Sequence, residues 1–201
     1  MKKLFHVFED QFTMPYMTAF HDKIISLPWR YSISAKTSKD DQKNSLLPIH
    51  NGKQIPIEHE DDDILMSYTA WNYEYPDIYN VEADNFLRFH LDYMMASIGY
   101  AVNPIQIYLN MYLYDQRTVE HGETETQCYH LLHLCNSYWE PEWGGENCFE
   151  DDETGEVIEM EYKPGRIVLF DHSIKHWTKP VKRHNTPRFT YVARSKELVK
   201  L

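Results

Sequence analysis

The second half of the chain is a succession of short segments rich in β-branched and aromatic residues, with turn-forming residues between them. Many short strands at such close spacing are typical of a β-sandwich or a barrel, and the sequence contains no internal repeat. The expected strands are residues 105–114, 129–134, 146–149, 157–162, 166–170, 176–181 and 188–193.

The first half of the chain contains the expected helices. The clearest is 81–98, in which Leu87 and Leu91 share one apolar face and Gly99 follows as a C-terminal cap. Thr13 begins an earlier helix. Helices followed by strands predict a mainly β chain with supporting helices (α+β), in the form of a jelly roll backed by helices. Short strands are also expected at residues 4–8, 31–35 and 64–73.

The chain has 201 residues, which is enough for one domain with a sizeable core. We expect a single domain, with residues 1–100 as a supporting region of helices and strands and residues 103–196 as the β core. The formal net charge of −11 disfavours nucleic acid and anionic membranes as partners. No apolar run approaches the roughly 18 residues of a membrane span.

The N-terminal apolar stretch is interrupted by His6 and Glu9, so the sequence does not predict a signal peptide. The cysteines are odd in number and form no C-x-x-C motif, and we expect reduced thiols in a cytoplasmic protein. They are Cys128, Cys135 and Cys148.

Three pairs of the form H-x-(D/E) are candidates for a metal site. A mononuclear oxidative iron site uses two histidines and one carboxylate, and leaves the other positions open. On extended chain, residues i and i+2 point the same way, so such a pair can supply two ligands. The pairs are His59/Asp61, His90/Asp92 and His121/Glu123.

Sequence context separates the three pairs. His90 and Asp92 fall inside the expected helix, where i and i+2 lie roughly 200° apart and cannot chelate together. The pair at 59–61 belongs to an acidic run, which favours a solvated loop. His121 and Glu123 lie between two expected strands, and this position favours them as ligands.

Residues 162–192 place a histidine and an arginine at the starts of two successive expected strands. His176 opens one strand and Arg188 opens the next, with a loop between them. Imidazole and carboxylate groups suit Fe(II), and a guanidinium fork grips a carboxylate with two hydrogen bonds. Strand ends carrying His121, Glu123 and His176 can meet at one mouth of a barrel.

Residues 110–194 resemble the catalytic core of the 2-oxoglutarate/Fe(II)-dependent dioxygenases, specifically the prolyl-4-hydroxylase-like group. The matching stretches are HGE at 121–123, LLHLCNSYWEPEWGGENCF at 131–149, PGRIVLFDHSIKHWTKPV at 164–181 and PRFTYVA at 187–193.

This resemblance implies a double-stranded β-helix core and an enzyme that hydroxylates a C–H bond, releasing succinate and CO2. His121, Glu123 and His176 would bind Fe(II), and Arg188 would hold the distal carboxylate of 2-oxoglutarate, with ascorbate as reductant. The substrate would be a prolyl or other protein side chain, or a small molecule. The group normally has Asp at the position of Glu123. Further cosubstrate-binding residues would be Tyr108, Tyr112, Leu134 and Thr190.

Other histidines have alternative interpretations. His130 shares one strand face with Leu134. One interpretation is that His130 points inward as a pocket residue or a further metal ligand. The favoured interpretation is an ordinary hydrogen-bonded core histidine. His172 competes with His176 as the distal ligand, but we expect it to be solvated in the crossing between strands. Residues 37–63 are either a lid or a surface loop.

Two functions from other classes stay open. A non-catalytic jelly roll, with a binding or structural role, is favoured by the glutamate at position 123. A cupin-type metal enzyme that does not use 2-oxoglutarate would recruit His130 or His133 and would not need Arg188.

Overall fold

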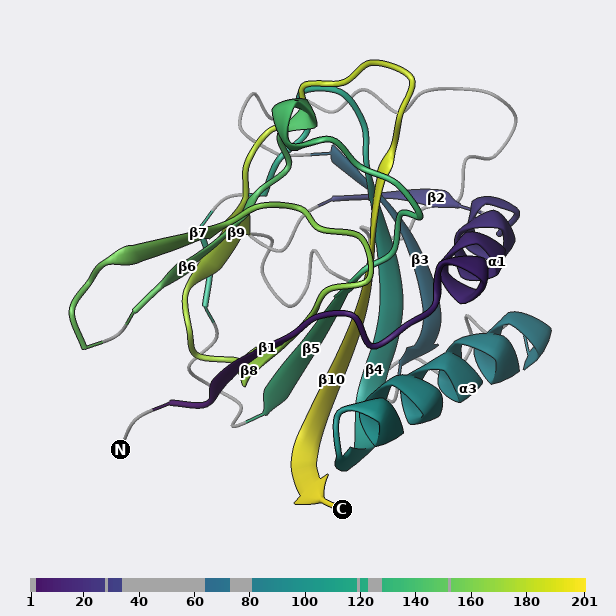
Figure 1. Cartoon of the computed structure of the whole chain (residues 1–201), viewed down its shortest axis with the longest axis vertical. Coiled ribbons are helices and arrows are strands. Elements are labelled where there is room, and N and C mark those ends of the chain that lie inside the picture. Colours follow the sequence, from purple (N-terminus) through teal and green to yellow (C-terminus); the bar gives the residue numbers. More distant parts are fainter. Residues whose placement is uncertain are drawn as a thin grey trace.

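The computed structural model describes residues 3–27, 29–33, 64–72, 81–118, 120–122, 128–151 and 153–201. In this part of the chain, two antiparallel sheets and two α-helices form the molecule. Figure 1 shows the helices on one side of the large sheet and the β6–β7 hairpin on the other. None of the helices described is long and apolar enough to cross a membrane.

The large sheet has seven strands, with β10 beside both β4 and β5. Its strand order explains how sequence-distant residues meet, because the last strand of the chain lies in the middle of the sheet. In sheet order the strands are β1 (Phe5–Phe8), β8 (Ile167–Asp171), β5 (Tyr129–Leu134), β10 (Arg188–Lys200), β4 (Tyr100–Tyr112), β3 (Ile64–Asn72) and β2 (Arg30–Ile33).

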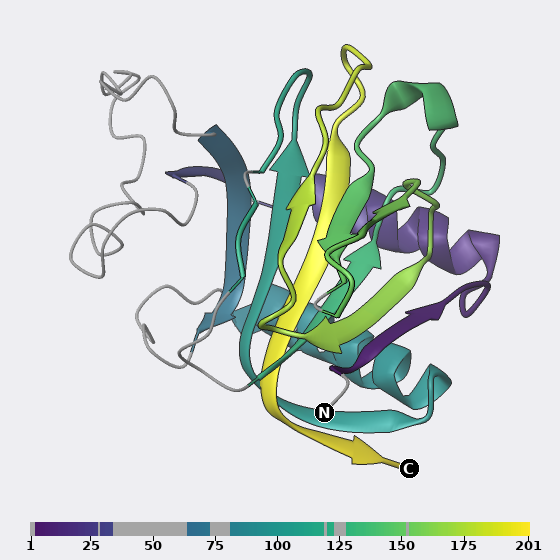
Figure 2. The ribbon, with the colours of Figure 1, turned by 90° about the vertical axis from the view of Figure 1, so that its left-hand side faces the viewer.

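The small sheet contains three short strands. In this part of the molecule the chain passes back and forth between the small sheet and the large sheet. From β5 the chain enters β6 and β7, returns to β8, passes through β9 and returns again to β10. This winding between two sheets is that of a jelly roll. Figure 2 shows the two sheets from the side. In sheet order the strands are β7 (Val157–Met160), β6 (Asn147–Glu150) and β9 (His176–Thr178).

Side chains alternate between the two faces of the large sheet, as the two-residue period of a strand requires. On β10, Phe189 and Tyr191 join a core shared with the helices, whereas Val192 joins a second core facing the small sheet. Directly opposite residues of antiparallel strands share a face, so Thr190 lies on the inward side with Leu134. The inward face of β10 therefore carries both polar and apolar side chains.

The helices α1 (Met14–Ile25) and α3 (Val81–Ser97) form where the sequence predicts them. The Thr13 hydroxyl accepts the N–H of Tyr16 at the N-terminus of α1, and Gly99 follows α3 with φ of +79°. Both helices bury an apolar stripe against the large sheet. Each such side chain, when fully buried, contributes about 1.5–3 kcal/mol to folding.

A buried polar chain links both helices to β5. The Tyr16 hydroxyl lies 2.7 Å from Nδ1 of His90, and Nε2 of His90 lies 3.0 Å from Nδ1 of His133. Phe20 stacks on the His90 ring, with centroids 3.8 Å apart. Burial lowers the pKa of both histidines, and that of His133 falls to about 3. Both imidazoles are therefore neutral near pH 7.

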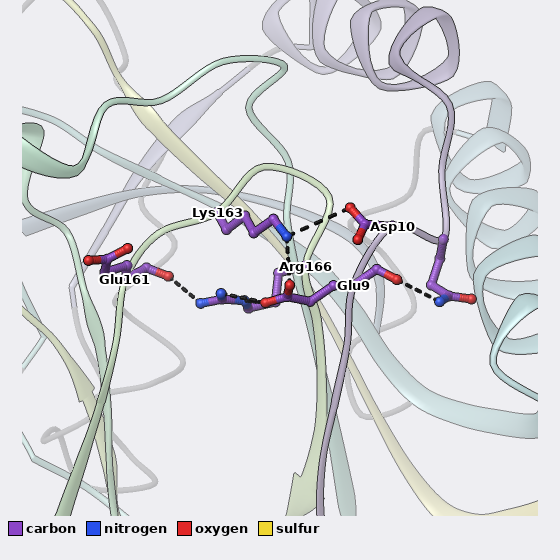
Figure 3. Close-up of polar contacts among 6 residues, drawn as sticks. Glu9, Asp10, Glu161, Lys163 and Arg166 are labelled. Carbon is purple, nitrogen blue, oxygen red and sulfur yellow. Dashed lines mark hydrogen bonds and ion pairs between the residues drawn. The ribbon is translucent and has the colours of Figure 1, made fainter.

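A cluster of ion pairs connects the N-terminal segment to the turn before β8 (Figure 3). Arg166 donates from Nε and Nη2 to Glu9 Oε1 at 2.9 and 2.5 Å, and Lys163 donates to Glu9 Oε2 at 2.6 Å. Arg166 also donates to the carbonyl oxygen of Glu161. The hydrogen bonds from Lys163 and then Arg166 lower the pKa of Glu9. The cluster supports the pairing of β1 with β8.

Some boundaries differ from the sequence-based expectation. Strand β10 runs on to Lys200 instead of ending at residue 193, because a bulge after Arg194 lets it continue pairing with the early part of β4. Strand β9 ends at Thr178, since the next residues form bridges to two loops instead. The three cysteines are buried and form no disulfide with one another.

Candidate active site

His121 and His176 lie side by side through a backbone bridge. The N–H of His176 donates to the carbonyl of His121 at 2.8 Å, and the reverse bond measures 3.2 Å. The two ring centroids are 4.3 Å apart. The local backbone therefore holds two imidazoles together that are far apart in sequence.

The His176 ring has a defined tautomer. Its Nδ1 lies 2.9 Å from the carbonyl oxygen of Ile174. A carbonyl oxygen only accepts, so Nδ1 carries the proton, and in the neutral imidazole Nε2 carries the lone pair. Metal-binding histidines commonly donate their second ring nitrogen in this way. The chemistry of His176 thus fits a metal ligand.

The expected carboxylate ligand, Glu123, lies outside the described residues, as do His59, Asp61 and residues 37–63. Within the described residues, no group of three or more His, Cys, Asp or Glu side chains has metal-binding geometry. Gly122 packs closely on the turn before β9, where an added Cβ would lie 3.0 Å from the Ser173 carbonyl oxygen. The structure accordingly brings together two of the three expected ligands and says nothing of the third.

His172 is buried, with 1% of its surface exposed, so the expectation that it is solvated is wrong. The turn folds the residue inward, because Ser173 donates from both its N–H and its hydroxyl to Asp171. Nε2 of His172 then accepts a hydrogen bond from Arg194 at 2.7 Å. Because a guanidinium only donates, this nitrogen of His172 carries the lone pair.

His130 also points inward, as one of the alternatives from the sequence requires. Its ring centroid lies 4.0 Å from that of His172 and 5.5 Å from that of His176. Burial, and then the neighbouring His172 and His176, lower its pKa well below the usual value. His133 points to the opposite face of β5, where it bonds to His90, so it cannot join the site. His90 and Asp92 lie on different sides of α3, one buried and the other exposed.

Arg188 is fully buried, and within the described residues it forms no ion pair. Its Nε donates to the carbonyl of Gly145 at 2.9 Å, and its Nη2 donates to Asn147 Oδ1 at 2.6 Å. The rings of Tyr112 and Tyr162 lie 4.8 and 4.7 Å from the guanidinium carbon. Its Nη1 is buried and has no hydrogen-bond partner in the part of the chain that the structure describes. Burial lowers the pKa of Arg188, but a group that usually titrates above 12 stays cationic at neutral pH.

The two consecutive glycines of the EWGGE stretch allow this close approach. A Cβ on Gly145 would lie 2.7 Å from Cδ of Arg188, and one on Gly144 would lie 2.6 Å from the Pro180 carbonyl oxygen. Both glycines have φ near +70°, which other residues adopt only with strain. The two glycines therefore leave the space that the Arg188 side chain and the nearby backbone occupy.

Asn136 fixes the backbone on both sides of Arg188. Its Nδ2 donates to the carbonyl of Pro187 and its Oδ1 accepts the N–H of Phe189, each at 2.8 Å. The Tyr162 hydroxyl lies 2.7 Å from both Asn136 Oδ1 and the Phe189 carbonyl oxygen. Asn136, which lies two residues after β5, thus holds the start of β10 in place.

The expected cosubstrate residues lie on the inward side of the large sheet. Leu134 is opposite Thr190, Tyr112 is opposite Arg188, and Tyr108 packs against the inward core. Thr190 Oγ1 is buried without a hydrogen-bond partner, like Nη1 of Arg188 two residues earlier. Buried polar groups are usually hydrogen-bonded, and a polar ligand bound on this strand face would satisfy both of these.

Sequence reasoning assigned no role to three residues around Arg188. Asn136, Asn147 and Tyr162 are far from it in sequence, and no spacing rule connects them. The only available signal was that Asn136 and Asn147 occur inside the stretch 131–149 that resembles the dioxygenase core.

A scan against protein-family models finds no match, and a search of curated proteins finds none either. Solved structures do match. A 2OG-Fe(II) oxygenase family oxidoreductase from Burkholderia pseudomallei aligns with a TM-score of 0.66 and 11% identity, covering 98% of this chain and 87% of that one. The chain has the fold of the 2OG-Fe(II) oxygenases.

Two more solved structures share this fold. A prolyl hydroxylase from Trichoplax adhaerens, in complex with a hypoxia inducible factor peptide fragment, has a TM-score of 0.59 and 14% identity over 95% of this chain and 82% of that one. HygX from Streptomyces hygroscopicus, with nickel and 2-oxoglutarate bound, has a TM-score of 0.58 and 11% identity over 99% and 84%. The predicted double-stranded β-helix core, mainly β with supporting helices, is therefore confirmed.

Proposed function

We propose that this protein is a 2-oxoglutarate- and Fe(II)-dependent dioxygenase that hydroxylates a C–H bond of its substrate. The observation that carries the proposal is Arg188, a buried cation whose Nη1 has no partner, with the unsatisfied Thr190 hydroxyl beside it. A buried charged group with an unsatisfied hydrogen-bond donor is costly, and a bound carboxylate would relieve that cost. The fold shared with 2OG-Fe(II) oxygenases supports this assignment.

The metal would be held by His121 and His176, with Glu123 as the carboxylate. The tautomer of His176 and the bridge that pairs the two imidazoles fit this role. When bound, the metal and 2-oxoglutarate supply the oxidation: O2 and 2-oxoglutarate become succinate, CO2 and the oxygen atom inserted into the C–H bond. The chain's own contribution is to orient both groups and to exclude water.

Arg188 would bind the distal carboxylate of 2-oxoglutarate. Its Nε and one N–H of Nη2 are already engaged, so Nη1 and the remaining N–H of Nη2 form the edge that a carboxylate can meet with two hydrogen bonds. Thr190 would donate a further hydrogen bond to the same carboxylate. Tyr112 and Leu134 would wall the cosubstrate on the inward face of the sheet.

The substrate that we propose is a prolyl or other side chain of a protein. The Trichoplax structure, which holds a peptide fragment, supports a protein substrate. A small molecule is the second possibility. Panels of peptides and small molecules, screened for stimulation of succinate release, would distinguish them.

The direct test is succinate release. Purified protein supplied with Fe(II), ascorbate and 2-oxoglutarate should form succinate slowly without substrate. A folded, iron-loaded protein that neither binds nor consumes 2-oxoglutarate would contradict the proposal. In that case a Glu123→Asp variant that gains activity would identify the natural chain as a non-catalytic jelly roll.

A further inference from the structure

The guanidinium of Arg188 is fixed in its plane and also in its rotation within that plane. The rings of Tyr112 and Tyr162 lie 4.8 and 4.7 Å from its central carbon, so they set the plane. Two hydrogen bonds on adjacent nitrogens, from Nε to Gly145 and from Nη2 to Asn147, then stop the group from turning. One hydrogen bond alone would act as a pivot.

Asn147 makes the only side-chain hydrogen bond to Arg188 among the residues that the structure describes. Its side chain is buried, with 6% of the residue exposed, and its backbone pairs with Met160 and Thr178 in the small sheet. The strand is therefore held by backbone bonds that do not need the Asn147 amide. This separates the amide's effect on Arg188 from the pairing of the strand.

We propose that Asn147 is a positioning residue that fixes the Arg188 guanidinium and thereby sets the length of the oxo-diacid that the site accepts. This inference rests on the proposed function. One end of the diacid meets the position between His121 and His176, which their backbone bridge determines. The other end meets Nη1 of Arg188, whose direction Asn147 determines.

With both ends fixed, a diacid that is one carbon too long cannot satisfy both. On this inference, 2-oxoglutarate meets both ends, and 2-oxoadipate loses either its hydrogen bonds to Arg188 or its coordination of the metal. Without the Asn147 amide, the guanidinium pivots about its bond to Gly145 and meets the longer acid.

The experiment measures binding, not turnover. Protein loaded with Ni(II) is titrated calorimetrically with 2-oxoglutarate and with 2-oxoadipate. We expect the natural chain to prefer 2-oxoglutarate by about tenfold or more, the discrimination typical of one methylene. Asn147→Ala should weaken 2-oxoglutarate binding about tenfold, the value of a hydrogen bond to a charged group, and 2-oxoadipate binding much less, so the preference collapses.

Asn147→Asp is the variant that keeps the shape of the side chain. Its carboxylate should pair with Arg188 and compete with the ligand, so that both acids bind at least about tenfold more weakly while the melting temperature is kept. Cys148→Ala is the control, because Cys148 is the next residue on β6, is buried, and is not among the described residues that hydrogen-bond to the Arg188 side chain. It should leave the ratio of the two affinities unchanged.

The outcomes separate this inference from the proposed function. If Asn147→Ala lowers the melting temperature but keeps the preference for 2-oxoglutarate, Asn147 is merely structural and the inference is wrong. A folded Asn147→Asp variant that loses the preference for 2-oxoglutarate would overturn it equally, even where the alanine variant fails to fold, because Asp keeps the oxygen that accepts from Nη2 of Arg188. If the natural chain binds neither acid, the proposed function is wrong and the inference falls with it.

Discussion

His121 and His176 exchange both of their backbone hydrogen bonds, so the two imidazoles are already paired without a metal. Pairing by backbone means that the side chains can be altered without removing the bridge. The consequence is that metal binding and folding can be separated by mutation at these positions.

His176→Ala should abolish stoichiometric iron or nickel binding and change the melting temperature little. The reason is that the variant loses an imidazole whose Nε2 lone pair fits a metal, and keeps the bridge. Elemental analysis of the metal-loaded protein gives the measurement. His172→Ala is the matched control and should retain one metal per chain; loss of metal only in the His172 variant would reverse the assignment.

Arg188→Ala should weaken 2-oxoglutarate binding about 10- to 100-fold, the loss expected for hydrogen bonds to a charged ligand group. The metal should stay bound, because Arg188 contacts neither His121 nor His176 by any hydrogen bond described. Arg188→Lys keeps the positive charge but loses the forked guanidinium. Its affinity for 2-oxoglutarate should therefore lie between those of the natural protein and of Arg188→Ala. Calorimetry with Ni(II)-loaded protein measures the affinity. An alanine variant with native affinity would remove Arg188 from the site.

Gly145→Ala should destabilise the protein and weaken 2-oxoglutarate binding. Its Cβ would lie 2.7 Å from Cδ of Arg188, so the arginine must move, and φ of +74° adds strain. We expect a loss of about 1–3 kcal/mol in the free energy of unfolding, measured with denaturant. Gly155→Ala is the control, since Gly155 has φ of +69° and open space around it. It should lose stability from strain alone and keep its affinity for 2-oxoglutarate.

The free energy of unfolding should fall as the pH drops below about 6.5. Burial lowers the pKa of His90, and that of His133 to about 3, so the folded state rejects protons that the unfolded state binds. Their contribution is complete above the unfolded pKa and is lost as the pH falls toward the folded values. The slope approaches about 1.4 kcal/mol per pH unit for each histidine that remains neutral.

Denaturant unfolding at several pH values between 7.5 and 4 measures this slope. In His133→Gln the slope should be shallower, because one of the histidines whose pKa burial lowers no longer titrates. An unchanged slope in that variant would show that the acid sensitivity has another source.

Most of the fold could be predicted because its signals are local. The strand at 129–134 and the helix near 81–98 follow from alternation and helical periodicity, and the structure has both. The length of β10 could not be predicted, since its continuation to Lys200 depends on a bulge and on pairing with β4, which lies far away in sequence.

The candidate site divides in the same way. Arg188 and His176 could be selected because each opens a strand within a recognisable stretch. The burial of His172 could not be predicted, because it depends on the turn that the Asp171 side chain forms with Ser173. The role of Asn147 depends on a contact across the two sheets, which no local pattern encodes.

Strand β5 carries histidines for two different environments, with His130 facing the small sheet and His133 facing α3. A shift of this strand by a single residue would exchange the faces, because side chains alternate with a period of two. The bond between His90 and His133 opposes such a shift from the helical side. A polar contact in the helix-facing core thus helps to set which side chains of β5 face the candidate site on the opposite side of the sheet. Mutations at His90 should therefore disturb the site by changing the register of β5, although His90 itself contacts no ligand.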